Sequence, residues 1–245
     1  MRTIRFMLIL ILLGFSMSCD KDHLLDCTKG TGPYITVTRY IQGFNKIYLS
    51  DNVDLKIVPG KNWMVKVTAG QLLIDAVITE LQGDKLYIRN ENRCNWVRSF
   101  SNTYTVEVAV PALQYINYNG SGNIICVDSI SYNGFTFDSW KGSGKIELNL
   151  NTASSHINIH LGNCAVKASG NSGVSYIYLN DVGIVDAANL SSGYTFIRNS
   201  STGAASVNAS TELTAEIQHT GNIYYYGNPI TINQSITGSG KLIKK

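Results

Sequence analysis

The sequence is poor in charge, in basic clusters and in helical periodicity, and each shortage excludes a class of protein. Charged residues make up 15% of the 245 residues, and the formal net charge is only +3. A nucleic-acid-binding surface needs a basic stripe, but the largest basic cluster here is the final segment, 241–245. Nucleic acid is therefore excluded as a partner. No segment shows a sustained helical period of apolar residues with capping residues. Many glycines, tyrosines and β-favouring residues instead predict an almost entirely β protein.

The chain also has no apolar run long enough to cross a membrane. Residues 6–15 are apolar, but a spanning helix needs about 20 such residues. Arg2 and Arg5 precede this run, and a small residue and Cys19 follow it, which is the layout of a secretory signal. Cys19 resembles the cysteine of a lipobox, so we expect a signal peptide over 1–18 and acylation of Cys19. The alternative is an ordinary cleaved signal with an incidental cysteine.

A repeated Gly-Ser-Gly phrase is the strongest positive signal. Gly122 and Gly144 stand 22 residues apart, and Gly221 and Gly240 stand 19 apart. A period near 20 with short β segments predicts stacked β coils. The copies are Gly120-Ser121-Gly122, Gly142-Ser143-Gly144, Gly238-Ser239-Gly240 and a reduced form at Thr220-Gly221; 170–173 and 192–194 are interpreted as degenerate copies.

We interpret these glycines as corner residues, needed for positive φ or for close backbone approach. The polar residue after each corner is expected to form an outward ladder, comprising Asn123, Lys145, Asn222 and Lys241. A phosphate-binding loop would instead need a helix after the glycines, and strands are predicted there. The expected organisation is a tether over 19–33 and one all-β domain over 34–245. That domain is divided into amino-terminal strands (34–112, including a hairpin around 82–84) and about six repeat coils (113–245).

The chain resembles the putative auto-transporter adhesin, head GIN domain family. The resemblance rests on the segments 41–47 (IQGFNKI), 53–57 (VDLKI), 83–88 (GDKLYI) and 118–122 (YNGSG), and on the segment 92–99. It covers about 40–245 and implies an all-β fold with right-handed parallel β-helix character and an envelope location. The family brings no established catalytic residues to transfer.

Four cysteines remain after Cys19, and they allow three pairings. Cys126 and Cys164 lie in alternating apolar segments about two coils apart, roughly 9.6 Å at the rung spacing of a β stack. That separation exceeds the reach of a disulfide, so we expect both to be buried small hydrophobic residues. Cys27 and Cys94 lie in polar, loop-like surroundings and are the predicted disulfide.

Candidate catalytic and binding residues are few. The acidic residues of the repeat region form no Asp-x-Asp pair, so we expect no catalytic site, no metal site and no cofactor. His156 and His160 share a strand face with Asn158 but stand about 13 Å apart, too far to share one ion. They are expected on a solvated outer face. Tyr224 and Tyr226 should point outward if Tyr225 points inward, and they are the predicted surface contact.

The sequence therefore predicts a non-enzymatic, lipid-anchored envelope protein. We expect it at the outer membrane, facing the periplasm or the cell surface, where it acts as an adhesin or a scaffold that presents a β-helical face to a glycan or protein ligand. The alternative is a module that binds or cleaves carbohydrate. A homo-oligomer is also compatible with the sequence, because the end of a coil stack is an unpaired sheet edge.

Overall fold

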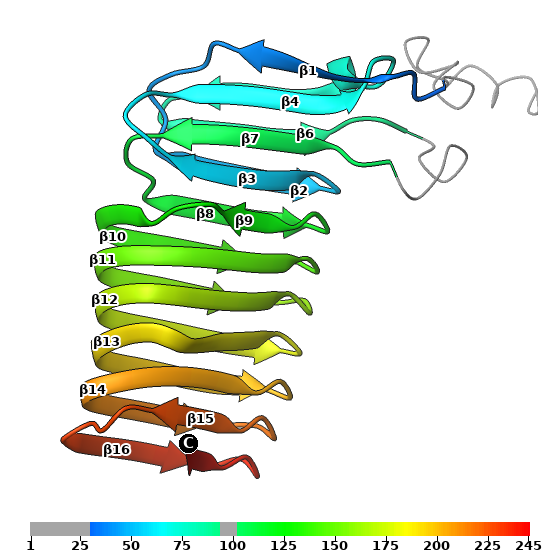
Figure 1. Ribbon diagram of the computed structural model, residues 1–245. Coiled ribbons are helices and arrows are strands. Elements are labelled where there is room, and N and C mark those ends of the chain that lie inside the picture. The colour runs from blue at the N-terminus through cyan, green and yellow to red at the C-terminus, as the bar shows by residue number, and fades with distance from the viewer. Residues whose placement is uncertain (1–29, 94–101) are drawn as a thin grey trace, which may run out of the picture.

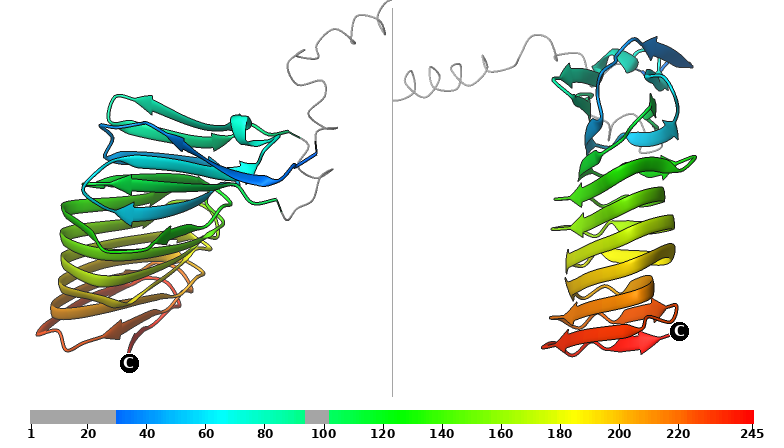
Figure 2. Two further views of the ribbon diagram at one scale, coloured as in Figure 1. Left: turned by 45° about the horizontal axis from the view of Figure 1, so that its top comes forward. Right: turned by 90° about the vertical axis from the view of Figure 1, so that its left-hand side faces the viewer.

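The computed structural model describes residues 30–93 and 102–245, and it forms a stack of β coils (Figure 1). The stack has about six turns, which confirms the all-β, coiled architecture. Because neighbouring coils pair in parallel, the strands form one continuous 17-stranded sheet that winds around a single core. Figure 2 shows the stack from two further sides, with the amino-terminal strands at one end and the carboxyl terminus at the other.

The first part of the chain builds one end of this stack. Its elements are β1 (Tyr34–Arg39), β2 (Lys46–Asp51), β3 (Asp54–Pro59), β4 (Met64–Gly70), the short 3-10 helix η3 (Ile74–Ala76), β5 (Val77–Gln82), β6 (Lys85–Asn90) and β7 (Thr105–Val110). β5 and β6 form the predicted antiparallel hairpin. β2 and β3 pair in parallel with β8 and β9, so these two early strands already form a rung of the stack.

The second part supplies the repeating coils. Its strands are β8 (Tyr115–Gly120), β9 (Ile124–Cys126), β10 (Ile130–Ser139), β11 (Lys145–Ile159), β12 (Ala165–Asp181), β13 (Ile184–Ser201), β14 (Ala205–Ile217), β15 (Ile223–Tyr226), β16 (Thr231–Ile236) and β17 (Leu242–Lys244). The long strands β11 to β14 each run along one side of the coil, continue around a corner and return along the other side. The stack therefore has two broad faces.

Each face is a ladder of strand segments in register. The first face consists of β6, β2, β8, the final segments of β10 to β14, and β16. The second consists of β4, β7, β3, β9, the initial segments of β11 to β14, β15 and β17. Alternation along each strand sends one set of side chains inward. In β11, Ile157 and Ile159 are buried while His156 and Asn158 point outward.

A column of residues at one corner sets how closely the coils stack. A β-carbon on Gly122 would lie 1.9 Å from the carbonyl oxygen of Val53, and one on Gly144 would lie 2.1 Å from that of Gly122. None of the column glycines has a positive φ, so close backbone approach is what requires glycine here. The whole column reads Val53, Gly122, Gly144, Cys164, Gly183, Gly203, Gly221 and Gly240.

This column corrects one sequence interpretation. Gly170 and Gly173 lie against the carbonyls of Leu150 and Ala153, on the rounded corner inside the long strands, and Gly193 follows Gly173 there. The segments 170–173 and 192–194 are therefore not degenerate copies of the Gly-Ser-Gly corner. The true corner positions in those coils, Gly183 and Gly203, lack the flanking glycine and serine that identify the motif elsewhere.

The outward ladder beside this corner is confirmed. The Asn123 side-chain oxygen accepts a hydrogen bond from the backbone N–H of Lys145 at 3.1 Å, and Asn222 accepts one from Lys241 at 2.8 Å. Inside the corner, the Tyr118 hydroxyl donates to the carbonyl of Gly122 and accepts from the N–H of Gly144. The ladder residues thus bind one coil to the next, which is a structural role.

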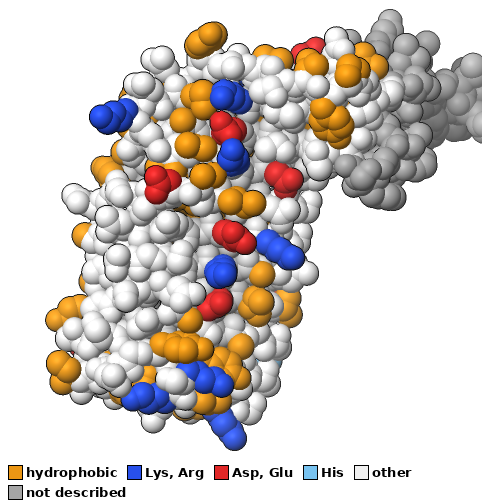
Figure 3. All heavy atoms as spheres, viewed as in Figure 1, with side chains coloured by type: hydrophobic (Ala, Val, Ile, Leu, Met, Phe, Trp, Pro, Cys, Tyr) orange, Lys and Arg blue, Asp and Glu red, His pale blue; other side chains and the backbone are white. Residues whose placement is uncertain are grey.

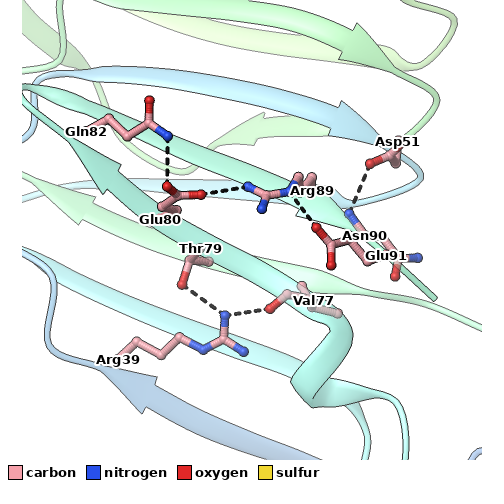
Figure 4. A network of polar contacts seen from close by, with 9 residues as sticks. All are labelled: Arg39, Asp51, Val77, Thr79, Glu80, Gln82, Arg89, Asn90 and Glu91. Carbon is pink, nitrogen blue, oxygen red and sulfur yellow. Dashed lines mark hydrogen bonds and ion pairs between the residues drawn. The ribbon is translucent and has the colours of Figure 1, made fainter. Parts of the chain in front are cut away.

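The amino-terminal end of the stack is closed by a polar network (Figure 4). Arg39 of β1 donates to the carbonyl of Val77 at 2.5 Å and to the hydroxyl of Thr79 at 2.9 Å. It therefore links β1, which pairs with the second face, to β5 on the edge of the first. Beside it, Arg89 forms ion pairs with Glu80 and Glu91. Arg39 thus ties the ends of the two faces together, while the Arg89 ion pairs lie within the β5–β6 edge of the first face.

Candidate functional site

The first face carries a row of aromatic side chains on its outer surface, and we call it the aromatic face. The outward residues of successive coils stand directly opposite one another in register. One outward column runs Lys46, Tyr115, Thr136, His156, Tyr176, Phe196, Thr214 and Asn233, and the next runs Tyr87, Tyr48, Asn117, Asp138, Asn158, Tyr178, Arg198 and Glu216.

Three rings of the first column stack face to face. The His156 and Tyr176 ring centroids lie 4.6 Å apart, and those of Tyr176 and Phe196 lie 5.2 Å apart, with interplanar angles of 10° and 12°. These spacings follow the coil repeat of about 4.8 Å. Because the inner ring faces cover one another, only the outer faces of His156 and Phe196 are left for other molecules.

A second group of rings lies beside the first. Trp140 and His160 stack with centroids 3.9 Å apart, and Tyr178 lies tilted against His160 at 5.7 Å. Asp138 holds this group in place, because its carboxylate accepts from Asn158 at 2.8 Å and contacts the His160 ring nitrogen at 3.2 Å. The histidines do lie on the outer face as predicted, but they are half-buried in ring stacks rather than solvated.

Short threonines at both ends of the ring stack leave two hollows. Thr136 follows Tyr115 and precedes His156, and Thr214 follows Phe196. We call them the Thr136 hollow, with a volume of about 500 Å³, and the Thr214 hollow, of about 240 Å³. The first hollow borders His156 at one end of the ring stack, and the second borders Phe196 at the other end.

The Thr214 hollow has a compensated charge. It is lined by the rings of Tyr176, Tyr178 and Phe196, together with Arg198 and Glu216. The Arg198 Nε lies 2.6 Å from Glu216 Oε2, and this hydrogen bond raises the pKa of Arg198. The pair offers a donor fork and acceptor oxygens next to apolar rings, which suits a neutral polyhydroxylated ligand.

The Thr136 hollow is basic. Lys46, Lys85 and Gln114 line it together with Tyr48 and other residues of the column. Hydrogen bonding to Asp84, at 2.7 Å, raises the pKa of Lys46. Lys46 therefore stays protonated, and the carboxylate of Asp84 compensates its positive charge. Burial raises the pKa of Tyr115, in the same hollow, to about 12, so this phenol stays neutral.

The second face is different in kind, and we call it the charged face. Its central outward column alternates in sign on both sides of the apolar Ile125: Lys66, Glu107, Lys56, Ile125, Glu147, Lys167 and Asp186. Lys56 and Glu107 form an ion pair at 2.7 Å. Figure 3 shows these charges as a line of alternating colours down the middle of the molecule. Such cross-strand pairs stabilise a sheet and leave little net charge for a partner.

The residues predicted for surface contact lie at the far end of the charged face. Tyr225 packs against the core, while Tyr224 and Tyr226 are only half-buried. Lys245 lies 4.9 Å above the Tyr224 ring. Their role in binding remains a prediction. The aromatic face was not predicted, although His156, Tyr176 and Phe196 recur at intervals of 20 residues in the sequence.

The other predicted sites divide into two groups. Cys19, Cys27 and Cys94 lie outside the described residues, so the lipid anchor and the disulfide remain predictions. Cys126 and Cys164 are unbonded, as expected, and Cys164 is buried, but Cys126 is only partly buried. Burial raises the pKa of both thiols, that of Cys126 to about 11. Within 30–93 and 102–245, no three His, Cys, Asp or Glu side chains gather as a metal site, and no helix has the length and apolar character to span a membrane.

A family model describes most of the chain. The model of the putative auto-transporter adhesin, head GIN domain, matches residues 43–229. No curated protein sequence matches the chain significantly.

Several solved structures share the fold. A putative adhesin from Bacteroides fragilis superposes with a TM-score of 0.81 at 18% identity, covering 87% of this chain and 97% of its own. A putative adhesin from Parabacteroides distasonis gives 0.69 at 17% identity, covering 88% and 98%. A putative lipid binding protein from the same organism gives 0.65 at 21% identity, also covering 88% and 98%. At these identities the likeness concerns the fold.

Proposed function

The chain belongs to the putative auto-transporter adhesin, head GIN domain family, and from that premise we propose that it is a non-catalytic adhesive protein of the cell envelope. In this proposal Cys19 carries a lipid at the outer membrane, and the coil stack presents its aromatic face to a ligand. The family match supports the adhesive role, and the signal-like segment that precedes Cys19 supports the anchor.

One observation carries the choice of face: the ring stack ends in two hollows that expose the faces of His156 and Phe196. Binding sites combine apolar rings with a few polar groups that orient the ligand. The aromatic face has both features, whereas the charges of the other face are set against one another in register.

Carbohydrate is the ligand class that this geometry favours. Carbohydrate binding is also the alternative function that the sequence predicts. One side of a pyranose ring is lined by C–H groups and packs on an aromatic ring, while its hydroxyls bond to nearby polar side chains. Cleavage needs two carboxyl groups free to act as acid and base. On this face Glu216 is paired with Arg198, and Asp138 with Asn158 and His160, which supports binding without catalysis.

The test is a glycan and matrix-protein array probed with the purified full-length protein. Saturable binding is expected, and it should be lost in the double variant Tyr176→Ser/Phe196→Ser. The double variant Glu147→Ser/Lys167→Ser, on the charged face, is the matched control and should bind normally. Silence across the array, or loss of binding in the control alone, would contradict the proposal. The anchor is tested separately by membrane fractionation of Cys19→Ala, which should release the protein.

A further inference from the structure

The two hollows differ in charge although they arise in the same way. We infer that the Thr136 hollow binds the carboxylated sugar unit of an acidic glycan. This inference rests on the proposed function, because it takes the aromatic face as the ligand-binding surface, and it adds the class of ligand and the place where that ligand binds.

The part of the hollow over Thr136 fits one flat ring. Tyr115 and His156 stand one coil above and one coil below Thr136, so their strands are about 9.6 Å apart. His156 and Tyr176, one coil apart, already stack with centroids at 4.6 Å. A ring inserted over Thr136 would therefore meet His156 at the spacing that the column uses elsewhere.

The floor of the hollow is kept low by small residues. Gly134, Thr136 and Ser154 line it. Gly134 differs from the corner glycines, because an added β-carbon would meet only the Ser154 hydroxyl, at 3.3 Å, within 4 Å. Neither a positive φ nor a backbone clash requires glycine here. The missing side chain at Gly134 therefore leaves the hollow wider, without a backbone constraint that demands it.

The charge of the hollow selects an acid. Two lysines line it, and Asp84 neutralises one of them, Lys46. Among the described residues no carboxylate forms an ion pair with Lys85, whose Nζ lies 5.4 Å from the centre of the Tyr48 ring. The other carboxylate near this end, Asp138, is held by Asn158 and His160. Lys85 is thus the cation of the hollow that has no carboxylate partner among the described residues, and it lies at the opposite end of the hollow from His156.

These groups define a binding mode. The hollow extends from Lys85 to His156, and Lys85 lies three strands from Thr136, about 14 Å at the strand spacing. One sugar ring of the glycan therefore packs on His156, and the carboxylate of the neighbouring acidic unit pairs with Lys85. Gln114 lies between them and can reach the hydroxyls. A charge-assisted contact of this kind contributes more than a neutral hydrogen bond. The Thr214 hollow, where Arg198 is already paired with Glu216, has no such preference for an acid.

The experiment is calorimetric titration of the full-length protein with trigalacturonate and with sialyllactose, each compared with its methyl ester. At least one acid should bind, and its uncharged ester should bind about tenfold more weakly. Lys85→Gln should remove this difference. Thr136→Tyr, which places a ring in the hollow, should weaken binding at least tenfold, whereas Lys167→Tyr places the same ring on the charged face and should leave binding within twofold.

Three results would overturn the inference: no binding of either acid at 10 mM, equal binding of acid and ester, or unchanged binding in a folded Thr136→Tyr variant. Thermal melting checks that the tyrosine variants fold. If Thr136→Tyr does not fold, the surface variant Lys85→Gln still tests whether the acid binds through its charge. If the acids fail while the array still shows saturable, Tyr176- and Phe196-dependent binding, the proposed function stands and only the acidic ligand is wrong.

Discussion

The two faces of the stack are built on the same coils but use their outward positions differently. On the charged face, neighbours such as Lys56 and Glu107 satisfy each other across the strands. On the aromatic face, neighbours also stack, but the series is interrupted at Thr136 and Thr214. The comparison indicates that charged neighbours pair across the strands on one face, whereas on the other face short threonines leave the outer sides of stacked rings beside hollows.

The largest expected effect comes from breaking the corner that joins both faces. Gly122→Ala places a β-carbon 1.9 Å from the Val53 carbonyl oxygen, so we expect a loss of about 3 kcal/mol or more in the free energy of unfolding. Denaturant unfolding measures this loss. Gly134→Ala is the matched control and should change stability by less than about 1 kcal/mol, and equal losses would show that the corner is not special.

The faces themselves are compared by removing one member of each ladder. Phe196→Ser should lower the free energy of unfolding by about 1 kcal/mol through the lost ring pair, and it should reduce ligand binding by at least tenfold. Lys167→Ser on the charged face should change both quantities little. Stability is read from denaturant unfolding and binding from the array ligand, and a charged-face variant that loses the ligand would reverse the assignment of the faces.

The smallest effect concerns the ion pairs of the charged face. Hydrogen bonding to Lys56 lowers the pKa of Glu107 below its ordinary value. A lowered pKa in the folded state means that this contribution is present above the unfolded pKa, near 4.5, and is lost as the pH falls through the lower folded value. Glu107→Gln should therefore cost about 0.5 kcal/mol at neutral pH and less at high salt.

This loss should also shrink below pH 4. Denaturant unfolding of the parent and the variant between pH 3 and 7, at two salt concentrations, measures it. A difference that grows on acidification would contradict the ion-pair account.

The stacked coils could be predicted from the sequence because Gly-Ser-Gly marks corners at Gly122, Gly144 and Gly240. Two corners of the same column were missed because Gly183 and Gly203 stand without those neighbours. Cys164, which occupies a column position, looks like any residue of an apolar segment. Close backbone approach between coils restricts only one position of each corner to a small residue. The neighbouring residues can vary, so the motif is not recognisable in every coil.

The aromatic face was harder to predict for a different reason. Stacking requires only a flat ring at each position, so histidine, tyrosine and phenylalanine can follow one another at 156, 176 and 196 without repeating a motif. The first rung, formed by β2 and β3, could not be predicted either. Val53 occupies the position that later coils fill with glycine, so the Gly-Ser-Gly motif does not occur there. Both features depend on which residues meet across coils, and only the register of the strands determines that.

The corner column has a consequence for how the length of this protein can change. Each coil is positioned by the carbonyl of the coil before it, as Gly144 is by Gly122 and Gly203 by Gly183. Insertion of a single residue would shift every later coil out of line with its neighbour, whereas duplication of a segment such as 184–203 would recreate both its upper and lower contacts. Growth of this molecule should therefore come in whole units of about 20 residues, and each added unit would extend the aromatic face by one position.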